Sequence, residues 1–401
     1  MLIRKAYKFK LKTNRKLEDK LLSFAGHCRF VWNKALAINL FKLKNKQRIM
    51  YYQELDFFSK LWKQSTEYNF LKECPSQTIQ QKLKDLEKSF KDCFDKRQIN
   101  KRLPRFKKRG SGDSFRYPQG FKVKDSKVFL PKIGWVKFRK SQEILGELKN
   151  ITVTRRTDGW YISIQVELEQ PEPKHSSKSI IGIDMGISKF ATMSTGDYIN
   201  PINSFKQHYK KLARVQRSLS RKVKFSTNWK KEKIQLQKIH TKISNIRRDF
   251  LHKSSTKISK SHAMIVMEDL KISNMSKSAK GDLKNPGKMV KAKSGLNKSI
   301  LDQGWYEFRR QLVYKQQWLG GDVIFVSPQN TSITCPLRNC RYKSKQNRKT
   351  QSDFVCVKCN YSNNADVVGA LNILRAGHVQ LASGDIGCIS DQAQESPKVT
   401  A

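Results

Sequence analysis

The stretch SIIGIDMGI at residues 179–187 decides the fold of the second half of the chain. It opens with an apolar run as long as a buried strand, and Asp184 follows at the end of that run. A second run, AMIVMED at 263–269, ends in Glu268. Helical patterns over 205–260 separate the two runs. Because strands alternating with helices indicate an α/β arrangement, we predict an α/β fold from about residue 179 onward.

The first half of the chain has a different pattern. Residues 1–12 alternate as a strand does, residues 15–100 are mostly periodic as helices, and residues 103–170 hold short strands between Gly and Pro. We expect residues 1–12 and 103–170 to form one β-rich domain with the helices inserted in it, which makes this half α+β. The stretch QPEPKHSSK at 170–178 is a linker.

The remainder of the second half is also predicted by periodicity. Residues 305–319 carry an apolar stripe at helical spacing, and residues 322–326 form an apolar strand that ends before Pro328. Residues 271–299 are rich in lysine and poor in core-forming side chains, so we expect a mobile loop there.

The charge of the chain points to a polyanionic partner. Its 401 residues include 81 Lys and Arg against 33 Asp and Glu, a net charge of +48. Such an excess is self-repelling unless a polyanion neutralises it, and phosphate contacts would make binding strong and salt-dependent. The run at 205–260 suits a phosphate-lined channel, with a solvated helix face as the alternative. A membrane is not expected as partner, because no run of ~20 apolar residues and no signal-peptide core exists. We therefore expect an intracellular protein.

Four of the eight cysteines are clustered. Cys335 and Cys340 form one pair, Cys356 and Cys359 a second, and two such pairs at this spacing are typical of a four-thiolate structural zinc site. The segment has little core of its own, so a metal would stabilise it. Four unrelated buried thiols are the alternative. The others, which are scattered and expected to be ordinary reduced thiols, are Cys28, Cys74, Cys93 and Cys388.

Three acids lie at the edges of apolar elements: Asp184, Glu268 and Asp366. Carboxylates from two strands and a helix could hold two divalent cations, which activate water and stabilise the leaving oxygen of a phosphodiester. Each acid also has a simpler interpretation. Asp184 could form a turn and Asp366 could favour a helix N-terminus. Glu268 and Asp269 are adjacent, so only one of them can face a common site.

Together these motifs resemble the TnpB proteins of bacterial insertion sequences, which are similar to the ancestors of type V CRISPR effectors. The resemblance covers most of the chain and rests on IGIDMGI (181–187), MEDL (267–270), GWYEFRRQLVYK (304–315), the two cysteine pairs and ADVVGALNI (365–373), with RFVWNKAL (29–36) and LPRFKKR (103–109) in the first half.

The resemblance implies a multidomain protein. It implies a RuvC-like, RNase H-type nuclease domain over 179–401 with a zinc finger inserted at 330–362. A wedge-like β domain over 1–14 and 101–172 precedes it, with a helical recognition domain at 15–100 inserted.

The resemblance also implies a chemistry. Asp184, Glu268 and Asp366 would be catalytic ligands of Mg²⁺ or Mn²⁺. The partners would be a guide RNA derived from the element end and double-stranded target DNA, cut beside a short element-associated motif. Tyr52 and Gln80 are the predicted nucleic-acid contacts, because they lie in the segment that reads this motif in the family. We expect an RNA-guided, metal-dependent DNA endonuclease in the bacterial cytoplasm, associated with the nucleoid.

The chain departs from the family pattern near the third acid. Ala365 stands where an arginine is usual, and Val368 and Gly369 replace an Asn and an Ala. The first cysteine pair is wider than usual, and Asn360 follows the last cysteine in place of Gly. These departures leave an RNA-guided repressor with a decayed site as one alternative. A strand-transferring transposase, which the same fold supports, and a zinc-finger regulator of DNA are the others.

Overall fold

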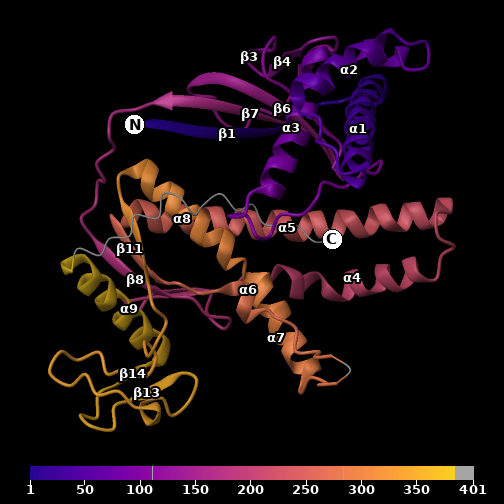
Figure 1. Ribbon diagram of the computed structural model, residues 1–401. Coiled ribbons are helices and arrows are strands. Elements are labelled where there is room, and N and C mark those ends of the chain that lie inside the picture. Colours follow the sequence, from indigo (N-terminus) through magenta and orange to yellow (C-terminus); the bar gives the residue numbers. More distant parts are fainter. Residues whose placement is uncertain (111, 283, 384–401) are drawn as a thin grey trace. The chain divides into compact units, whose positions relative to one another are not determined.

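The computed structural model describes residues 1–110, 112–282 and 284–383, which belong to two compact units, Met1–Pro171 and Glu172–Ala401 (Figure 1). Cys388 and the end of the predicted nuclease domain, residues 384–401, lie outside the described residues. The two units are taken in turn.

Unit 1 joins helices to antiparallel strands. Its elements in chain order are β1 (Leu2–Lys10), α1 (Arg15–Lys44), α2 (Tyr52–Gln64), η1 (Asn69–Glu73), α3 (Ser76–Phe94), β2 (Ser114–Tyr117), β3 (Lys122–Lys124), β4 (Lys127–Leu130), β5 (Gly134–Lys137), β6 (Glu147–Arg156) and β7 (Gly159–Glu169).

The main sheet of unit 1 has the order β1-β7-β6-β2. β1 pairs antiparallel with β7 in a register that sets Ile3 opposite Leu168, so the first strand and the β-rich segment share one sheet. Alternate residues of β7 are buried, and helices α1 and α3 pack against β2. Phe9, Phe115 and Trp160 are among the largest buried side chains of the core. A smaller sheet has the order β3-β4-β5.

Unit 2 alternates strands and helices. Its elements are β8 (Ile180–Asp184), β9 (Ala191–Met193), β10 (Tyr198–Ile199), α4 (Ser204–Ser220), α5 (Thr227–Ser261), β11 (Met264–Glu268), α6 (Ile272–Met275), α7 (Val290–Gln303), α8 (Trp305–Leu319), β12 (Asp322–Val326), η2 (Lys345–Asn347), β13 (Asp353–Val355), β14 (Ser362–Asn364) and α9 (Ala365–Ala382). The mixed α/β fold expected for this half is present.

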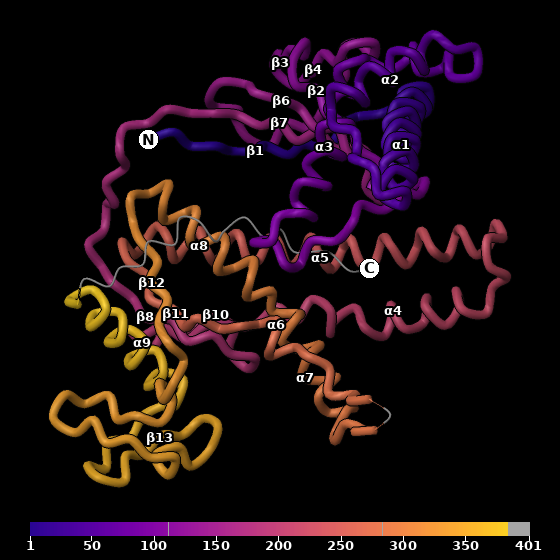
Figure 2. The backbone as a smooth tube through the Cα atoms, in the orientation of Figure 1, coloured from indigo at the N-terminus to yellow at the C-terminus, as the bar shows by residue number. Residues whose placement is uncertain are grey.

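The central sheet of unit 2 is covered on both faces. Its order is β10-β9-β8-β11-β12, and β8, β11 and β12 run parallel. Ile265 and Met267 pack into the core formed with α5 and α8, whereas Val266 packs into the core formed with α9. Strands buried on both faces must be apolar throughout, which explains the continuous runs at 180–183 and 264–267. Figure 2 shows the backbone of these elements.

Helix α9 approaches the sheet closely because glycine lines the contact. A Cβ on Gly182 of β8 would lie 2.2 Å from the backbone oxygen of Ala370, and one on Gly377 would lie 2.5 Å from a methyl group of Val266. These distances leave no room for a side chain, so the glycines allow the helix to pack directly on the strands.

The prediction of a loop at 271–299 is wrong in part. Residues Ile272–Met275 and Val290–Gln303 form helices α6 and α7, although the segment is lysine-rich. Tertiary contacts override the composition, since Ile300 is buried in the core and Asp302 accepts hydrogen bonds from the first backbone N–H groups of α4. Asp302 also pairs with Arg247 of α5 at 2.7 Å, so it joins three helices.

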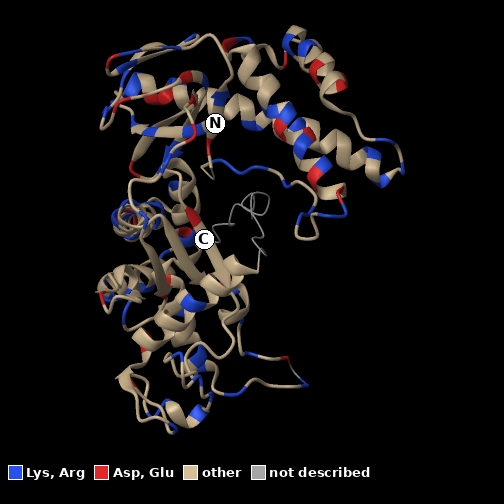
Figure 3. Ribbon diagram, turned by 90° about the vertical axis from the view of Figure 1, so that its left-hand side faces the viewer, with Lys and Arg blue, Asp and Glu red and all other residues tan. Residues whose placement is uncertain are grey.

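Basic side chains are spread over both units (Figure 3). In the part of the chain that the structure describes, no helix is both long enough and apolar enough to cross a membrane.

Candidate metal centres

Two of the three predicted acids lie side by side at one edge of the sheet of unit 2. β8 and β11 are parallel neighbours, with Ile183 opposite Met267, so their next residues, Asp184 and Glu268, end the two strands at the same edge. Side chains alternate between the faces of a strand. Asp184 therefore shares the face of Gly182, and Glu268 shares that of Val266, which is the face covered by α9.

The third acid comes from α9 itself. Asp366 lies in the first turn of this helix, and the side chain of Asn364 caps the helix by accepting hydrogen bonds from the backbone N–H groups of residues 366 and 367. A Cβ on Gly369 would lie 2.9 Å from Oδ2 of Asp184. The glycine that departs from the family pattern thus leaves room for the carboxylate of Asp184 against the helix.

The electrostatics show that the acids act on one another. Burial, together with repulsion from Glu268 and Asp366, raises the pKa of Asp184 to about 7. Burial also raises the pKa of Glu268, and a hydrogen bond from Thr331 opposes that rise. Because the ionised carboxylates repel one another, a bound cation would stabilise them. Hard carboxylate oxygens are the ligands that Mg²⁺ prefers.

The neighbour of Glu268 faces the other way. Asp269 shares the face of Ile265 and Met267, and it forms an ion pair with Arg309 of α8. The guanidinium of Arg309 also lies 3.6 Å from the ring centre of Phe325. Asp269 is thus paired with Arg309, whereas Glu268 is hydrogen-bonded to Thr331.

Sequence reasoning missed the polar side chains that support Glu268. The hydroxyl of Thr331 donates to Oε1 of Glu268 at 2.6 Å. Asn372 of α9 donates to the backbone oxygens of Thr331 and Thr334 at 2.8 and 2.7 Å, which fixes the segment that carries the hydroxyl. Thr331 and Glu268 are 63 positions apart, and Asn372 and Thr331 are 41 positions apart, so no local sequence motif predicts these contacts.

An arginine distant in sequence lies beside the third acid. Arg348, next to η2, brings a guanidinium nitrogen within 3.7 Å of Oδ1 of Asp366. It also donates to the backbone oxygen of Gln351 at 2.9 Å. Position 365, where the family usually has arginine, is a buried alanine that packs with Phe354 and Val368. The chain therefore retains a guanidinium near Asp366, supplied from a different segment.

The four clustered cysteines meet in space. The sulfur atoms of Cys335, Cys340, Cys356 and Cys359 all lie within 4.8 Å of one another, and the described residues contain no other such compact group of three or more His, Cys, Asp or Glu ligand atoms. The Cys335–Cys359 and Cys340–Cys356 Sγ distances are both 3.6 Å. A disulfide needs about 2.05 Å. Tetrahedral Zn–S bonds of about 2.3 Å place sulfurs roughly 3.8 Å apart, so these residues fit zinc.

The backbone around the cysteines is shaped for thiolates. Arg341 and Asn360, each directly after the second cysteine of a pair, have φ of 52° and 56°. Asparagine tolerates this left-handed conformation better than most residues, which explains how Asn360 replaces the usual glycine. Although burial opposes the change, backbone N–H groups of Cys359 and Lys358 help lower the pKa of Cys356 to about 7.

A buried asparagine links the two cysteine pairs. Asn347 donates to the backbone oxygens of Ile333 and Tyr342 at 2.9 and 3.1 Å, beside the first pair. Its side-chain oxygen accepts from the backbone N–H of Val357, between the cysteines of the second pair, at 3.0 Å. This role could not be predicted from the sequence, because a single asparagine in a polar segment has many possible partners.

The two predicted nucleic-acid contacts both lie near Asp56 in unit 1. The amide of Gln80 on α3 donates to Asp56 of α2 at 3.4 Å, and Tyr52 lies one turn before Asp56. Burial and Asp56 raise the pKa of Tyr52, and the Lys84 ammonium lies 4.7 Å from the centre of its ring. Their role in binding nucleic acid stays a prediction.

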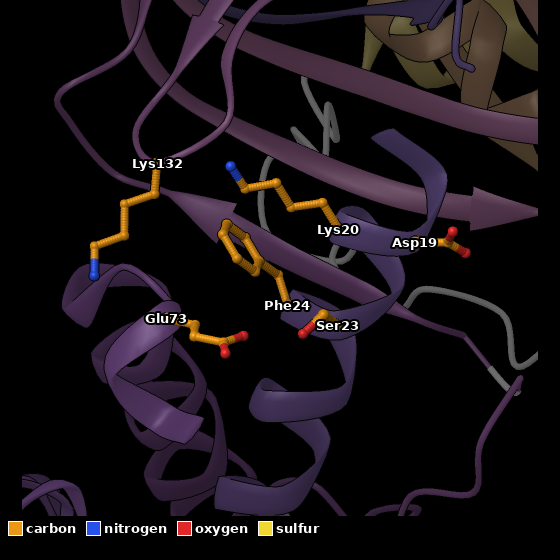
Figure 4. A pocket seen from close by; sticks show the side chains of 6 residues that line it. All are labelled: Asp19, Lys20, Ser23, Phe24, Glu73 and Lys132. Atoms are coloured by element: carbon orange, nitrogen blue, oxygen red, sulfur yellow. The ribbon is translucent and has the colours of Figure 1, made fainter. Parts of the chain in front are cut away.

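A hollow in unit 1 holds none of the predicted site residues. It measures about 510 Å³ and is lined by Asp19, Lys20, Ser23, Phe24, Glu73 and Lys132 (Figure 4). Two acids and two lysines line it beside a phenylalanine, and Lys132 donates to the backbone oxygen of Lys72. Such balanced charges form neither a cation site nor an anion site.

Comparison with known families identifies the class of protein. Residues 163–279 match the OrfB_IS605 family, described as "Probable transposase", and residues 305–373, which include the cysteine cluster, match the "Cas12f1-like, TNB domain". Residues 1–47 match a family described as a helix-turn-helix domain, although they form one strand and one helix here. These matches define a transposon-associated protein of the IS605 OrfB type.

Comparison with individual proteins gives the family. The chain is 52% identical to the Escherichia coli K12 protein named "Putative RNA-guided DNA endonuclease InsQ", over 95% of this chain and 94% of that protein. It is 30% identical to a "Putative RNA-guided DNA endonuclease" of Streptomyces pristinaespiralis, over 96% and 92%. The chain belongs to the TnpB family. The solved mini-RNA-guided endonuclease CRISPR-Cas_phi3 covers 93% of the chain with a TM-score of 0.46 and 12% identity.

Proposed function

We propose that the protein is an RNA-guided, metal-dependent DNA endonuclease that is encoded by a transposable element and cuts DNA beside a short element-associated motif. One observation supports the proposal: Asp184 and Glu268 end neighbouring parallel strands, and both Glu268 and Asp366 of α9 raise the pKa of Asp184, in a chain whose net charge is +48. A protein that only bound polyanions would gain nothing from carboxylates that repel one another at the edge of the sheet. The relatives' names, which refer to RNA-guided DNA endonucleases, agree with it.

The proposal includes the domain organisation. The nuclease domain would be RuvC-like over 179–401, with the zinc finger at 330–362. The wedge-like β domain would comprise 1–14 and 101–172, and the helical recognition domain 15–100 would carry Tyr52 and Gln80. The strands β8 and β11 and the helix α9, each contributing one acid, support an RNase H-type arrangement of the nuclease part.

The residues of the site have separate tasks in this proposal. Asp184, Glu268 and Asp366 would hold two Mg²⁺ or Mn²⁺ ions, which activate water for phosphodiester hydrolysis and stabilise the leaving oxygen. Thr331 orients Glu268 by its hydrogen bond, and Arg348 orients Asp366 by its ion pair. The three acids repel a phosphate, so the surrounding lysines and arginines must attract the nucleic acid.

The partners would be a guide RNA derived from the element end and a double-stranded DNA target. Base pairing would read the sequence, and the protein would read the motif and the shape of the duplex. A protein with such a target would associate with the bacterial nucleoid.

The test is to purify the protein from its host, sequence the RNA that accompanies it, and incubate the complex with a DNA library that matches that RNA. With Mg²⁺ we expect cuts at a fixed distance from a short motif, leaving a 5′ phosphate and a 3′ hydroxyl, and with EDTA none. A preparation without any defined RNA would contradict the guide, and cutting in EDTA would contradict the metal.

The same experiment distinguishes the alternatives. A repressor with a decayed site would bind the matching DNA without cutting it, and Ala365 is the observation that favours that outcome. A strand-transferring transposase, the activity suggested by the family description, would bind element ends without RNA and join them to new DNA.

A further inference from the structure

The turn between α4 and α5 exposes apolar side chains. Val223 and Phe225 are 79% and 66% exposed, and the ring of Phe225 lies 5.5 Å from that of Trp229, at 58° to it. Figures 1 and 2 show α4 and α5 as two long helices joined by this turn. The buried core of the hairpin is elsewhere, around Leu212, Val215, Ile239 and Ile243. Trp229 precedes Ile239 by ten residues, which is roughly 15 Å along a helix.

The backbone of the turn is hydrogen-bonded and strained. The N–H of Ser226 donates to Val223 at 3.1 Å, and the Ser226 hydroxyl accepts from the N–H of Trp229 at 3.1 Å, which caps α5. Phe225 has φ of 71°, a left-handed conformation that is costly for a bulky residue and free of strain for glycine. Because its ring is exposed, burial does not offset that cost. A strained residue that holds an aromatic ring in solvent suggests a binding role.

The charges around the rings select an anionic partner. Residues 221–233 contain one acid, Glu232, and six cations: Arg221, Lys222, Lys224, Lys230, Lys231 and Lys233. The ammonium groups of Lys224 and Lys233 lie 5.4 and 4.9 Å from the ring centres of Phe225 and Trp229. Aromatic rings surrounded by lysines match the chemistry of a single-stranded nucleic acid, whose bases stack on rings and whose phosphates pair with cations. A second protein with an apolar surface would have to desolvate these charges.

We propose that the turn at 221–233 binds an unpaired stretch of nucleic acid by stacking its bases on Phe225 and Trp229. This deepens the proposed function by naming a contact surface for its partners. It rests on a nucleic-acid partner but not on the three carboxylates. RNA and DNA share the required chemistry, and the experiment separates them.

The experiment measures affinity of the full chain for labelled 20-nucleotide single strands of RNA and of DNA and for a DNA duplex, without Mg²⁺, over a series of salt concentrations. The variant is F225A with W229A. The matched control is F41A, which removes a ring that is 67% exposed on α1. Base stacking on a ring contributes about 1–3 kcal/mol, which is roughly 5- to 150-fold in affinity.

We expect the double variant to bind single strands at least fivefold more weakly, with the salt slope unchanged, because the phosphate contacts remain. Duplex binding and the F41A control should stay within about twofold of the wild type. A preference for RNA or for DNA then identifies the strand. A single F225G variant should unfold at the same temperature as the wild type or higher, yet bind single strands as weakly as a single F225A variant.

Three results would overturn the proposal: single-strand affinity within twofold of the wild type, equal weakening for duplex and single strand, or variants that melt earlier with unchanged binding. The last would show that the rings pack against protein. Loss of DNA cutting by an Asp184 variant with intact single-strand binding would leave this surface in place. Failure of the ring variants would in turn leave the cleavage proposal untouched.

Discussion

The four-cysteine cluster and the proposed three-carboxylate site would both hold metal ions, but they are built in opposite ways. The cysteines lie in a segment with a very small core. Apart from the cysteines themselves, the one aromatic side chain that is fully buried in the described core around them is that of Phe354. The acids lie on a sheet packed on both faces, where cores around Phe308 and around Ile373 hold the elements in place. We therefore expect the first region to need a bound metal for folding and the second to fold without one.

Removal of zinc should have the largest effect. Cys356→Ser, or a strong chelator, should lower bound zinc from one per chain to nearly none and unfold residues 330–362, because structural zinc contributes apparent binding free energies of about 10–16 kcal/mol in small zinc domains. Hydrogen exchange and metal analysis would measure this. Cys93→Ser, which changes a free cysteine of α3, is the control. Full protection of 330–362 in metal-free protein would contradict the dependence.

A side chain between β8 and α9 should damage the other region. Gly182→Ala sets a Cβ against backbone atoms of Ala370 and Leu374, so α9 must move and the free energy of unfolding of unit 2 should fall by about 1–3 kcal/mol or more. Denaturant unfolding would measure the loss, and zinc content should stay at one per chain. Gly295→Ala, a helical position with nothing within 4 Å of the added Cβ, is the matched control. Equal stability of the two variants would refute the close packing.

Neutralising one acid should stabilise the metal-free protein at high pH. The folded pKa of Asp184, about 7, exceeds its ordinary value of 3.8, so the folded state holds an extra proton between these values and stability is lost as pH rises through them. Asp184→Asn should therefore raise the unfolding free energy at pH 8 by about 2–4 kcal/mol, and the gain should shrink towards zero as pH falls to 4.

Urea unfolding in EDTA at several pH values would measure this gain. Added Mg²⁺ should stabilise the wild type more than the variant, which has lost a ligand. A gain that does not depend on pH would rule out repulsion among the acids as its source.

The smallest effect is expected where the two regions touch. Arg348→Gln removes the ion pair with Asp366, but the partners are 3.7 Å apart and their side chains are 28% and 27% exposed. Such pairs contribute about 0–1 kcal/mol, so the melting temperature should shift by a few degrees at most. Arg338→Gln, an exposed arginine of the same segment, is the control. A loss of several kcal/mol would mean that Arg348 supports the fold and does more than orient Asp366.

The sequence predicted most where the pattern was long or the chemistry specific. The helix Trp305–Leu319 and the strand Asp322–Val326 were predicted to the residue, and the four cysteines meet as their spacing indicated. The prediction failed at α7, since a lysine-rich segment gives no sign that Ile300 and Asp302 will find partners in distant helices.

Within the carboxylate site, the acids could be predicted and their support could not. Each acid follows or begins an apolar element, which is a local signal. Thr331, Arg348 and Gly369 matter because of contacts across the fold, with Glu268, Asp366 and Asp184 respectively. Nothing in their own surroundings in the sequence distinguishes them from other polar or small residues.

Cleavage by Asp184→Ala tests the central claim most directly, with the wild type and Asp249→Ala beside it. Asp249 lies on α5 with a side chain that is 63% exposed, so its removal costs one negative charge outside the site. With Mg²⁺ and DNA matching the co-purified RNA, we predict that the wild type and Asp249→Ala cut, while Asp184→Ala keeps its RNA but cuts at least 1,000-fold more slowly, about 4 kcal/mol of lost transition-state stabilisation. Full cleavage by Asp184→Ala would contradict the account.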